Sequence, residues 1–290
     1  MRALWRYSFF LFFTFHLMPV LAEEQQIGLL WKIEKSDVAA SYLFGTIHSE
    51  DKRVTNLPKA VKQAFEQADS VSTEISLDLE NMLKVTLAMM FQGEEKLSDF
   101  LDKSYYEKTV TALKAYGLPE LAVRKLKPWT VILTLSMPKS ETGKALDMIL
   151  YEKAVKAKKA VYGLETIEEQ LAVFEDLSMA EQIKLLKETV DKLDENAALF
   201  ENMHRIYLQK NLTELMTFSQ QHMQKTDNPK LMDKFIEGIL YKRNLRMLER
   251  MQARLQEGNA FVAVGALHLP GKQGLLHLLK EQGYRISAVY

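Results

Sequence analysis

The sequence predicts an α/β protein, with βαβ-type units at both ends of the chain joining one central sheet and a large, mostly helical middle. Two observations carry this prediction: a short layout repeated near the two ends, and long stretches of helical apolar spacing between them. The composition agrees with it, because 47% hydrophobic and 26% charged residues are typical of a globular fold.

The first β-containing unit begins with the apolar run at 41–44, which leads into a turn from Gly45 to His48. A polar loop, a helical stretch at 58–68 and a second β-like run at 71–75 follow. This order of strand, turn, helix and strand is typical of a βαβ unit, whose strands lie parallel and are joined by a right-handed crossover.

The last unit repeats this order, with the apolar run at 260–264 leading into a second turn, from Gly265 to His268. A helical stretch and a final run at 285–290 complete the chain. A glycine at such a turn allows tight or positive-φ backbone geometry. If both units join one sheet, His48 and His268 each lie just past the carboxyl end of a strand, where ligands bind in open α/β sheets.

Between the two units the chain is predicted to be mostly helical. Apolar spacing indicates helices at 79–91, 105–116, 129–135, 144–158 and about 230–255, and a short strand at 160–164. Ser178 and Glu181 form a capping box that predicts the start of a further long helix. No linker or low-complexity tract divides residues 23–290, so we expect them to form a single domain.

Residues 1–22 have the pattern of a secretory signal peptide. Arg2 and Arg6 precede an apolar stretch at 8–21, and a small-residue cleavage site ends at Ala22. This stretch is short for a membrane span, which needs about 20 apolar residues. The chain has no cysteine, so no lipid can be attached at the junction. We therefore expect a periplasmic or secreted protein with no stable membrane span after signal removal.

Charge and motif content exclude several classes of function. Basic and acidic residues each number 38, so the chain has no large basic field and we expect no nucleic-acid partner. The lack of cysteine excludes disulfides and thiolate metal ligands. The sequence also lacks a Gly-x-Ser-x-Gly elbow, a His-Glu-x-x-His motif and a phosphate-cradling glycine loop.

His48 and His268 are the main candidates for chemistry, because neutral imidazole is the commonest metal ligand. Either histidine alone is more often a hydrogen-bonded core or loop residue, but the matched Gly-x-x-His pair favours a functional reading. Glu74 and Glu165 each close a strand-like run, where a charged residue is often only the first solvated position. Two histidines with one or two carboxylates would suit Zn²⁺, Mn²⁺, Co²⁺ or Fe²⁺.

Three further polar residues are ambiguous from the pattern alone. Arg243 and Asn244 lie on a helix rich in charged residues, so a solvated charged face explains them as well as a site does. Asp147, on an earlier helical segment, is equally open.

Three motifs spread along the chain carry a family resemblance. They are residues 42–48 (YLFGTIH), 161–166 (VYGLET) and 264–271 (VGALHLPG). Together with shorter likenesses at 127–129, 145–147 and 243–244, they cover roughly the whole mature chain. In these motifs the sequence resembles the TraB/GumN/Tiki family, in its bacterial periplasmic GumN-like branch. The resemblance implies a Tiki/TraB-like α/β fold in which the two histidines lie near each other.

The same resemblance implies a divalent metal, since Tiki-type members are regarded as metal-dependent proteases that act outside the cell. The positions that match the family's active-site motifs are His48, Glu74 and His268, with Glu165, Arg243 and Asn244 as supporting residues. We therefore hypothesise a metal-dependent hydrolase, specifically a peptidase, that works in the periplasm on a peptide or other small-molecule substrate.

In this hypothesis His48 and His268 bind the divalent ion, whose identity (Mn, Co, Zn or Fe) stays open. Glu74 completes the ligand shell or acts as a general base. Arg243 would stabilise a developing oxyanion and Asn244 would orient the substrate. Glu165 would be a second carboxylate ligand or would hold a histidine tautomer, and Asp147 would support the ligands from behind.

Two alternatives use the same residues. The chain could be a non-catalytic periplasmic protein that binds a peptide or small ligand in the same cleft without turnover. A weaker alternative is a structural metal site that only ties the two ends of the chain together.

Overall fold

The computed structural model describes residues 25–226 and 228–290, so the predicted signal peptide at 1–22 lies outside the described residues. Six strands form one mixed sheet in the order β4-β3-β5-β2-β1-β6. The strands are β1 (Leu30–Glu34), β2 (Ser41–Thr46), β3 (Ser70–Thr73), β4 (Ala160–Gly163), β5 (Ala260–Gly265) and β6 (Arg285–Ala288). The α/β fold class predicted from the sequence is confirmed.

Four of these strands run parallel and place their carboxyl ends at one edge of the sheet. Thr46 of β2 pairs with Gly265 of β5, and Thr73 of β3 pairs with Ala263 of β5 and with Gly163 of β4. The three inner strands β2, β3 and β5 are almost entirely buried, as expected for parallel strands with both faces covered. The residues that follow the four strands therefore emerge next to one another.

The other end of the sheet differs from the sequence prediction. β1, which the sequence analysis does not predict, lies antiparallel between β2 and β6. β6 runs in the same direction as β5, but β2 and β1 separate the two strands. The last unit is therefore strand, helix and strand in order, with β2 and β1 between its two parallel strands, just as β5 lies between β2 and β3 of the first unit. Main-chain pairing with β1 decides this arrangement, and such pairing leaves no pattern in the sequence of β6 itself.

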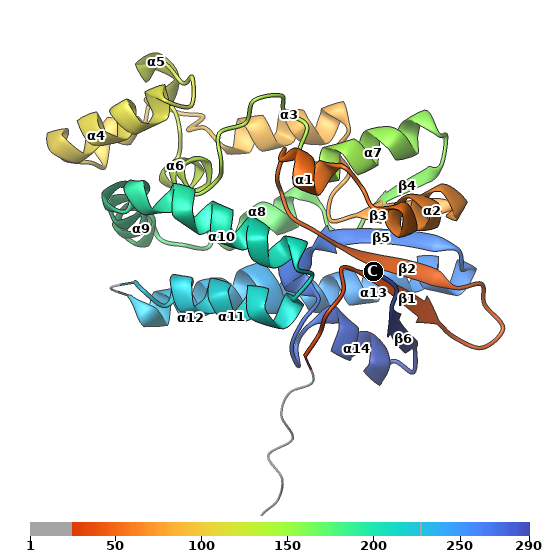
Figure 1. Cartoon of the computed structure of the whole chain (residues 1–290). Coiled ribbons are helices and arrows are strands. Elements are labelled where there is room, and N and C mark those ends of the chain that lie inside the picture. The colour runs from red at the N-terminus through yellow and green to blue at the C-terminus, as the bar shows by residue number, and fades with distance from the viewer. Residues whose placement is uncertain (1–24, 227) are drawn as a thin grey trace, which may run out of the picture.

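Helices cover both faces of the sheet and extend away from it (Figure 1). Within the described residues the α-helices are α1 (Lys52–Thr55), α2 (Lys59–Gln67), α3 (Leu79–Ala88), α4 (Lys103–Lys114), α5 (Glu120–Val123), α6 (Pro128–Leu135), α7 (Leu146–Lys156), α8 (Ile167–Glu175), α9 (Met179–Asp191), α10 (Asn196–Leu208), α11 (Leu212–Met223), α12 (Pro229–Ile236), α13 (Arg243–Glu257) and α14 (Leu275–Glu281). None of these helices is long and apolar enough to cross a membrane.

Apolar faces explain how these helices pack. In Figure 1, α2 and α7 lie on one side of the sheet, while α13 and α14 lie on the other. Phe65 of α2, for example, packs edge-on against Phe261 of β5, with ring centroids 5.4 Å apart. A second apolar core, which includes Leu113, Val131 and Leu186, joins α4, α6 and α9 away from the sheet.

The capping box predicted from Ser178 and Glu181 is present. Ser178 Oγ accepts a hydrogen bond from the amide of Glu181 at 3.3 Å, and the Glu181 carboxylate accepts from the amide of Ser178 at 2.7 Å. This is the capping box expected before α9.

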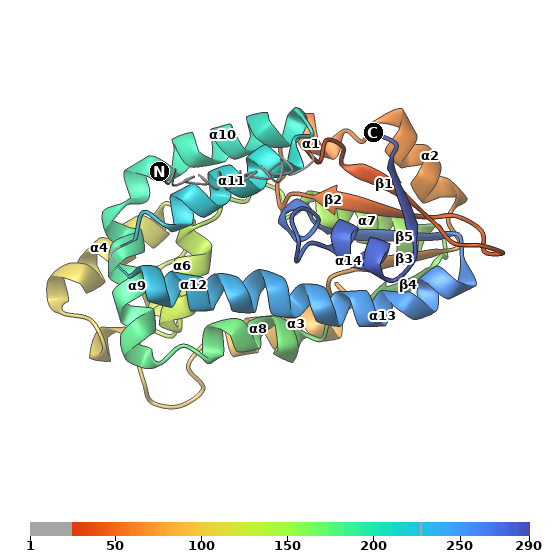
Figure 2. The ribbon, with the colours of Figure 1, turned by 90° about the horizontal axis from the view of Figure 1, so that it is seen from below.

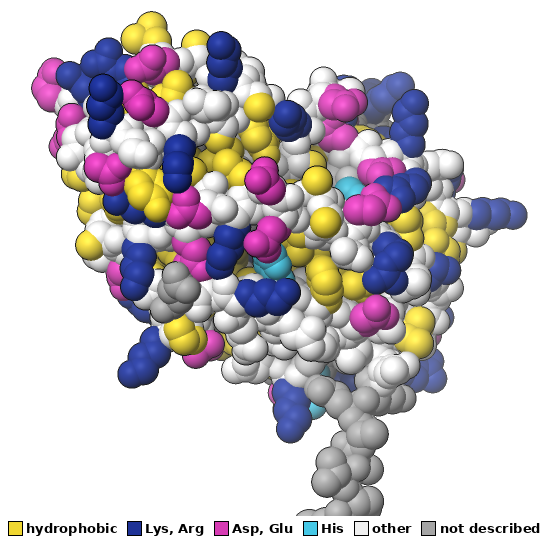
Figure 3. Space-filling model, turned by 60° about the vertical axis from the view of Figure 1, so that its left-hand side comes forward, with side chains coloured by type: hydrophobic (Ala, Val, Ile, Leu, Met, Phe, Trp, Pro, Cys, Tyr) yellow, Lys and Arg dark blue, Asp and Glu magenta, His cyan; other side chains and the backbone are white. Residues whose placement is uncertain are grey.

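On the face shown in Figure 3, Lys and Arg side chains are interspersed with Asp and Glu, and hydrophobic side chains gather toward the middle.

The helix predicted over about 230–255 is interrupted. α12 and α13 form one continuous rod in Figure 2, but a π-helical segment, Glu237–Lys242, joins them. Gly238 in this segment faces Val173 of α8, and a Cβ added there would lie 3.1 Å from Val173 Cγ1. α13 ends at Glu257, and the φ of +80° at the following residue, Gly258, suits glycine. π-Segments in helices are frequent at functional sites, and Arg243 follows this one directly.

Candidate active site

The candidate residues come from four neighbouring strand ends. Glu74 follows β3 directly, and Glu165 lies two residues after β4. His48 lies two residues after β2, and His268 ends the short 3-10 turn that follows β5. The register of the parallel strands therefore brings these residues to one edge of the sheet.

His268 is buried, with 4% of its surface exposed, and its ring is held by Asn244. His268 Nδ1 lies 2.6 Å from Asn244 Oδ1, and Asn244 Nδ2 donates to the carbonyl oxygen of Gln273 at 2.7 Å. Because the second bond identifies the amide nitrogen, the first must be donated by His268 Nδ1–H. The free lone pair of the ring is therefore on Nε2, which lies 3.6 Å from Glu74 Oε1.

Glu74 is oriented by donors on both of its oxygens. Oε2 accepts from Arg243 Nη2 at 2.7 Å and from Gln170 Nε2 at 3.2 Å. Oε1 accepts from the backbone amide of Gly265 at 2.7 Å and faces His268. The carboxylate is thus positioned to present Oε1 toward the imidazole lone pair.

Gly265 is needed here for space. Its φ of −52° is ordinary for any residue, so the positive-φ reading of this Gly-x-x-His turn does not apply. A Cβ at Gly265 would lie 3.2 Å from Glu74 Oε1 and 3.4 Å from His268 Cδ2. Gly45 has no positive φ either, and a Cβ there would lie 3.2 Å from Ala266 Cα. Both glycines allow a close approach that a side chain would block.

Burial and charge favour a neutral imidazole beside an ionised carboxylate. Burial lowers the pKa of His268 to about 4, although Glu74 opposes this shift. Burial alone would raise the pKa of Glu74, but Arg243 and His268 outweigh it and lower this pKa to about 2. At neutral pH the pair therefore has the protonation states that a metal ion requires of its ligands.

Glu165 has a different environment from Glu74. Its side chain is fully buried, Oε2 accepts from Arg243 Nε at 2.7 Å, and Oε1 accepts from Arg246 Nη1 at 2.8 Å. Both oxygens are therefore engaged by arginines. This geometry favours a supporting role for Glu165 over the ligand role considered from the sequence.

Arg243 and Asn244 are both buried, so the solvated-face explanation of them is wrong. Arg243 binds Glu74 and Glu165, and its Nη1 donates to the carbonyl oxygen of Ile239 at 3.2 Å. Asn244 has both ends of its amide engaged within the protein. In this arrangement Arg243 holds the carboxylate of Glu74, and Asn244 holds the ring of His268.

His48 is the exposed member of the set, with 66% of its side chain accessible. Its Nδ1 lies 3.4 Å from Asp147 Oδ2, and Asp147 Oδ1 accepts from Thr46 Oγ1 at 2.6 Å. The Asp147 contact, more than any other influence, raises the pKa of His48, and the charge of Glu74 adds to the effect. Asp147 thus contacts one ring nitrogen of His48, and the other, Nε2, has no hydrogen-bond partner within the described part of the chain.

The Glu74–His268 pair fits a divalent ion. In a tetrahedral zinc site with ligands about 2.1 Å from the metal, neighbouring ligand atoms lie about 3.4 Å apart. The observed separation of 3.6 Å between His268 Nε2 and Glu74 Oε1 is close to this value. Across residues 25–226 and 228–290, no group of three or more His, Cys, Asp or Glu side chains is arranged to hold a metal.

A family model described as the TraB/PrgY/gumN family matches residues 29–288. This chain belongs to that family. The match extends from the first strand to the last, so it includes all four strand ends of the site. The resemblance inferred from the three motifs is confirmed.

Several curated relatives are similar over most of the chain. Metalloprotease TIKI2 of Danio rerio is 23% identical over 92% of this chain and 62% of its own length. Metalloprotease TIKI1 of Homo sapiens is 24% identical over 90% of this chain and 61% of its own length. The protein YbaP of Shigella flexneri is 23% identical over 83% of this chain and 88% of its own. The chain thus spans about three fifths of the length of these Tiki relatives, and no solved structure gave a significant match.

The sequence analysis did not identify two residues that contact the carboxylates of the candidate site. Gln170 binds Glu74, and Arg246 binds Glu165. Gln170 lies in the stretch directly after the 161–166 motif, and Arg246 lies one helical turn beyond Arg243. Spacing on α13 could have singled out Arg246, but its helix carries several arginines whose contacts only the fold distinguishes.

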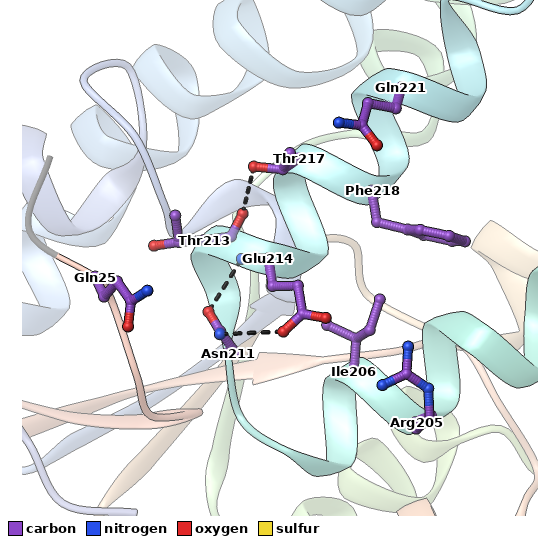
Figure 4. Close-up of a pocket in the computed structure, with 9 residues that line it drawn as sticks. All are labelled: Gln25, Arg205, Ile206, Asn211, Thr213, Glu214, Thr217, Phe218 and Gln221. Atoms are coloured by element: carbon purple, nitrogen blue, oxygen red, sulfur yellow. Dashed lines mark hydrogen bonds between the residues drawn. The ribbon is translucent and has the colours of Figure 1, made fainter.

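Two hollows on the described part of the molecule are lined by neither Glu74 nor His268. One of about 430 Å³ opens between α10 and α11, and Figure 4 shows Glu214, Arg205 and Phe218 among its lining residues. It shares none of the predicted site residues. A smaller hollow of about 250 Å³ adjoins Glu165 and is lined by α3 and the start of α8.

Proposed function

We propose that this chain is a metal-dependent peptidase of the TraB/PrgY/gumN family and that it acts in the periplasm. The observation that carries the proposal is the pairing of His268 Nε2 with Glu74 Oε1 at 3.6 Å, between a buried histidine and a partly buried carboxylate at the carboxyl edge of the sheet. The relatives named metalloproteases support a peptide substrate and a metal.

His268 and Glu74 would hold the ion, with His48 as the third ligand from the neighbouring strand end. All three follow strands of the sheet that pair in parallel, β2 and β3 each with β5, which supports the proposal. A bound divalent ion would polarise the scissile carbonyl and supply an activated water at neutral pH. The ion's identity is open among Mn, Co, Zn and Fe, because imidazole and carboxylate ligands suit all four.

The surrounding residues would set the orientation of these ligands. Asn244 holds the tautomer of His268, and Asp147 plays the corresponding part for His48. Arg243, itself fixed by Glu165, holds Oε2 of Glu74. Partners behind metal ligands typically contribute about 10- to 100-fold in affinity or activity.

Of the two roles first considered for Glu74, we propose that of ligand. A general base works best when its pKa is near the operating pH. The pKa of Glu74 is lowered to about 2, mainly because Arg243 and His268 outweigh the effect of burial. A permanently ionised carboxylate suits a cation better than it suits proton transfer.

The test compares peptide cleavage and metal content in the wild type, His48→Ala and His268→Ala. We expect one divalent ion per chain in the wild type, cleavage that stops on chelation, and loss of both properties in the variants while they stay folded. His277→Ala is the matched control, since His277 lies on α14 and pairs with Glu281 at 3.3 Å. Peptide that binds tightly, stays intact and needs no metal would instead support the non-catalytic binding protein.

Export remains a proposal that rests on residues 1–22 alone. The test is fractionation of expressing bacterial cells, followed by N-terminal sequencing of the purified protein. We expect a periplasmic protein that begins at Glu23. A cytoplasmic protein that retains residues 1–22 would contradict the proposal without affecting the site.

A further inference from the structure

Charged side chains of alternating sign extend outward from Glu74 along one face of α13. Arg243, Arg246 and Arg250 are spaced three and four residues apart, so they share that face. Glu165 lies between Arg243 and Arg246, with N–O distances of 2.7 and 2.8 Å. Glu169 lies between Arg246 and Arg250, with N–O distances of 3.6 and 2.6 Å.

The inner part of this row is buried, and its outer part reaches solvent. The side chain of Glu165 is 0% exposed and that of Arg243 is 7% exposed, whereas that of Arg250 is 38% exposed. Buried charges interact much more strongly than exposed ones, because water does not screen them. The position of Arg243 therefore depends closely on the charges beside it.

Arg243 is shared between two carboxylates. Its Nη2 lies 2.7 Å from Glu74 Oε2 and 2.7 Å from Glu165 Oε2. Arg246 supplies the second positive charge that Glu165 needs. Without Arg246, buried Glu165 would have Arg243 as its single cationic partner, and Arg243 would be drawn away from Glu74.

We propose that Arg246 is a positioning residue for the candidate site, acting through Glu165 and Arg243 on the carboxylate of Glu74. It contacts neither Glu74 nor His268. Its consequence for metal binding rests on the proposed function, but its effect on the position of Glu74 does not. Two readouts, one of them metal-free, therefore separate the two ideas.

The test compares Arg246→Met with Arg250→Met, which removes the same charge from the same helix face. Arg250 is a suitable control because it binds Glu169 and the carbonyl oxygen of Leu164, one step outside the Glu165 contact. The metal-free readout is the amide proton shift of Gly265 in an NMR spectrum of deuterated protein, since this amide donates to Glu74 Oε1. The second readout is Zn²⁺ affinity by calorimetry.

We expect Arg246→Met to move the Gly265 amide resonance and to weaken Zn²⁺ binding about 10- to 100-fold, while Arg250→Met changes neither. An unmoved Gly265 resonance in Arg246→Met, or an equal change in Arg250→Met, would overturn the proposal. If Arg246→Met does not fold, Arg246→Gln decides on the same two readouts, because it also removes the positive charge beside Glu165 but keeps a polar side chain. A wild type that binds no Zn²⁺ or other divalent ion would contradict the proposed function, and the Gly265 shift would still decide the role of Arg246.

Discussion

Asn244 Oδ1 accepts a hydrogen bond from Nδ1 of His268 at 2.6 Å, and this contact directs the other ring nitrogen toward Glu74. Asn244 is itself held by the carbonyl oxygen of Gln273. This series of contacts, from Gln273 through Asn244 and His268 to Glu74, therefore determines the tautomer of His268 and the direction in which its Nε2 points. At the neighbouring strand end, Asp147 contacts Nδ1 of His48 in a similar way, but at the longer distance of 3.4 Å.

Removing the Asn244 amide should weaken metal binding without removing a ligand. We expect Asn244→Ala to lower divalent-ion affinity about 10- to 100-fold, because His268 loses the acceptor that sets its tautomer. Calorimetric titration with Zn²⁺ measures the effect. Asn202→Ala on the exposed side of α10 is the control, and wild-type affinity in Asn244→Ala would show that the contact does not matter.

Glu165 should matter for stability more than its neighbour Glu169. Breaking a buried ion pair by removing one partner costs about 3–5 kcal/mol, whereas exposed pairs contribute about 0–1 kcal/mol. We therefore expect Glu165→Gln to lower the free energy of unfolding by about 3 kcal/mol, and Glu169→Gln by about 1 kcal/mol or less. Urea denaturation of both variants checks this, and equal losses would contradict the difference in burial.

Stability should fall as the pH is lowered toward 4. The pKa of His268 is about 4 in the folded protein, mainly through burial, against about 6.5 in an unfolded chain. Between these values the unfolded chain binds the extra proton, so the folded state loses stability as pH decreases. At about 1.4 kcal/mol per pKa unit, the full loss attributable to His268 is about 3 kcal/mol.

Comparison of the wild type with His268→Gln isolates this contribution. We expect the difference in unfolding free energy between the two proteins to shrink from pH 7 to pH 4.5. This window stops above the range in which Glu74 titrates. For the control His277→Gln, we expect the unfolding free energy to change with pH as it does in the wild type. If the unfolding free energy of His268→Gln also changes with pH as in the wild type, His268 is not the source of the lost stability.

Gly265 should tolerate no side chain if the site works as proposed. A Cβ would lie 3.2 Å from Glu74 Oε1, so Gly265→Ala must displace the carboxylate that pairs with His268. We expect about 10-fold weaker Zn²⁺ binding with near-wild-type circular dichroism, since the φ of Gly265 is open to alanine. Unchanged affinity would show that Glu74 has room to move.

Sequence patterns predicted the fold class and the strand ends because these features are local. Apolar runs that stop at a glycine and a polar residue indicated β2 and β5, and the turn positions of His48 and His268 followed from them. Parallel pairing then required Glu74 and Glu165 to emerge at the same edge. The π-segment before Arg243 was not predictable in this way, because its spacing reflects packing against α8.

The sequence by itself therefore determined the α/β class and which residues gather at the sheet edge, since periodicity and turn residues encode both along the chain. Its three motifs carried the family resemblance. Only the tertiary structure decided which side chains each of these residues contacts. Glu74 and Glu165 have the same side chain and the same strand-end position, yet one faces His268 and the other is enclosed by two arginines. That difference arises from contacts between residues about 80 to 190 positions apart, and no local pattern carries such information.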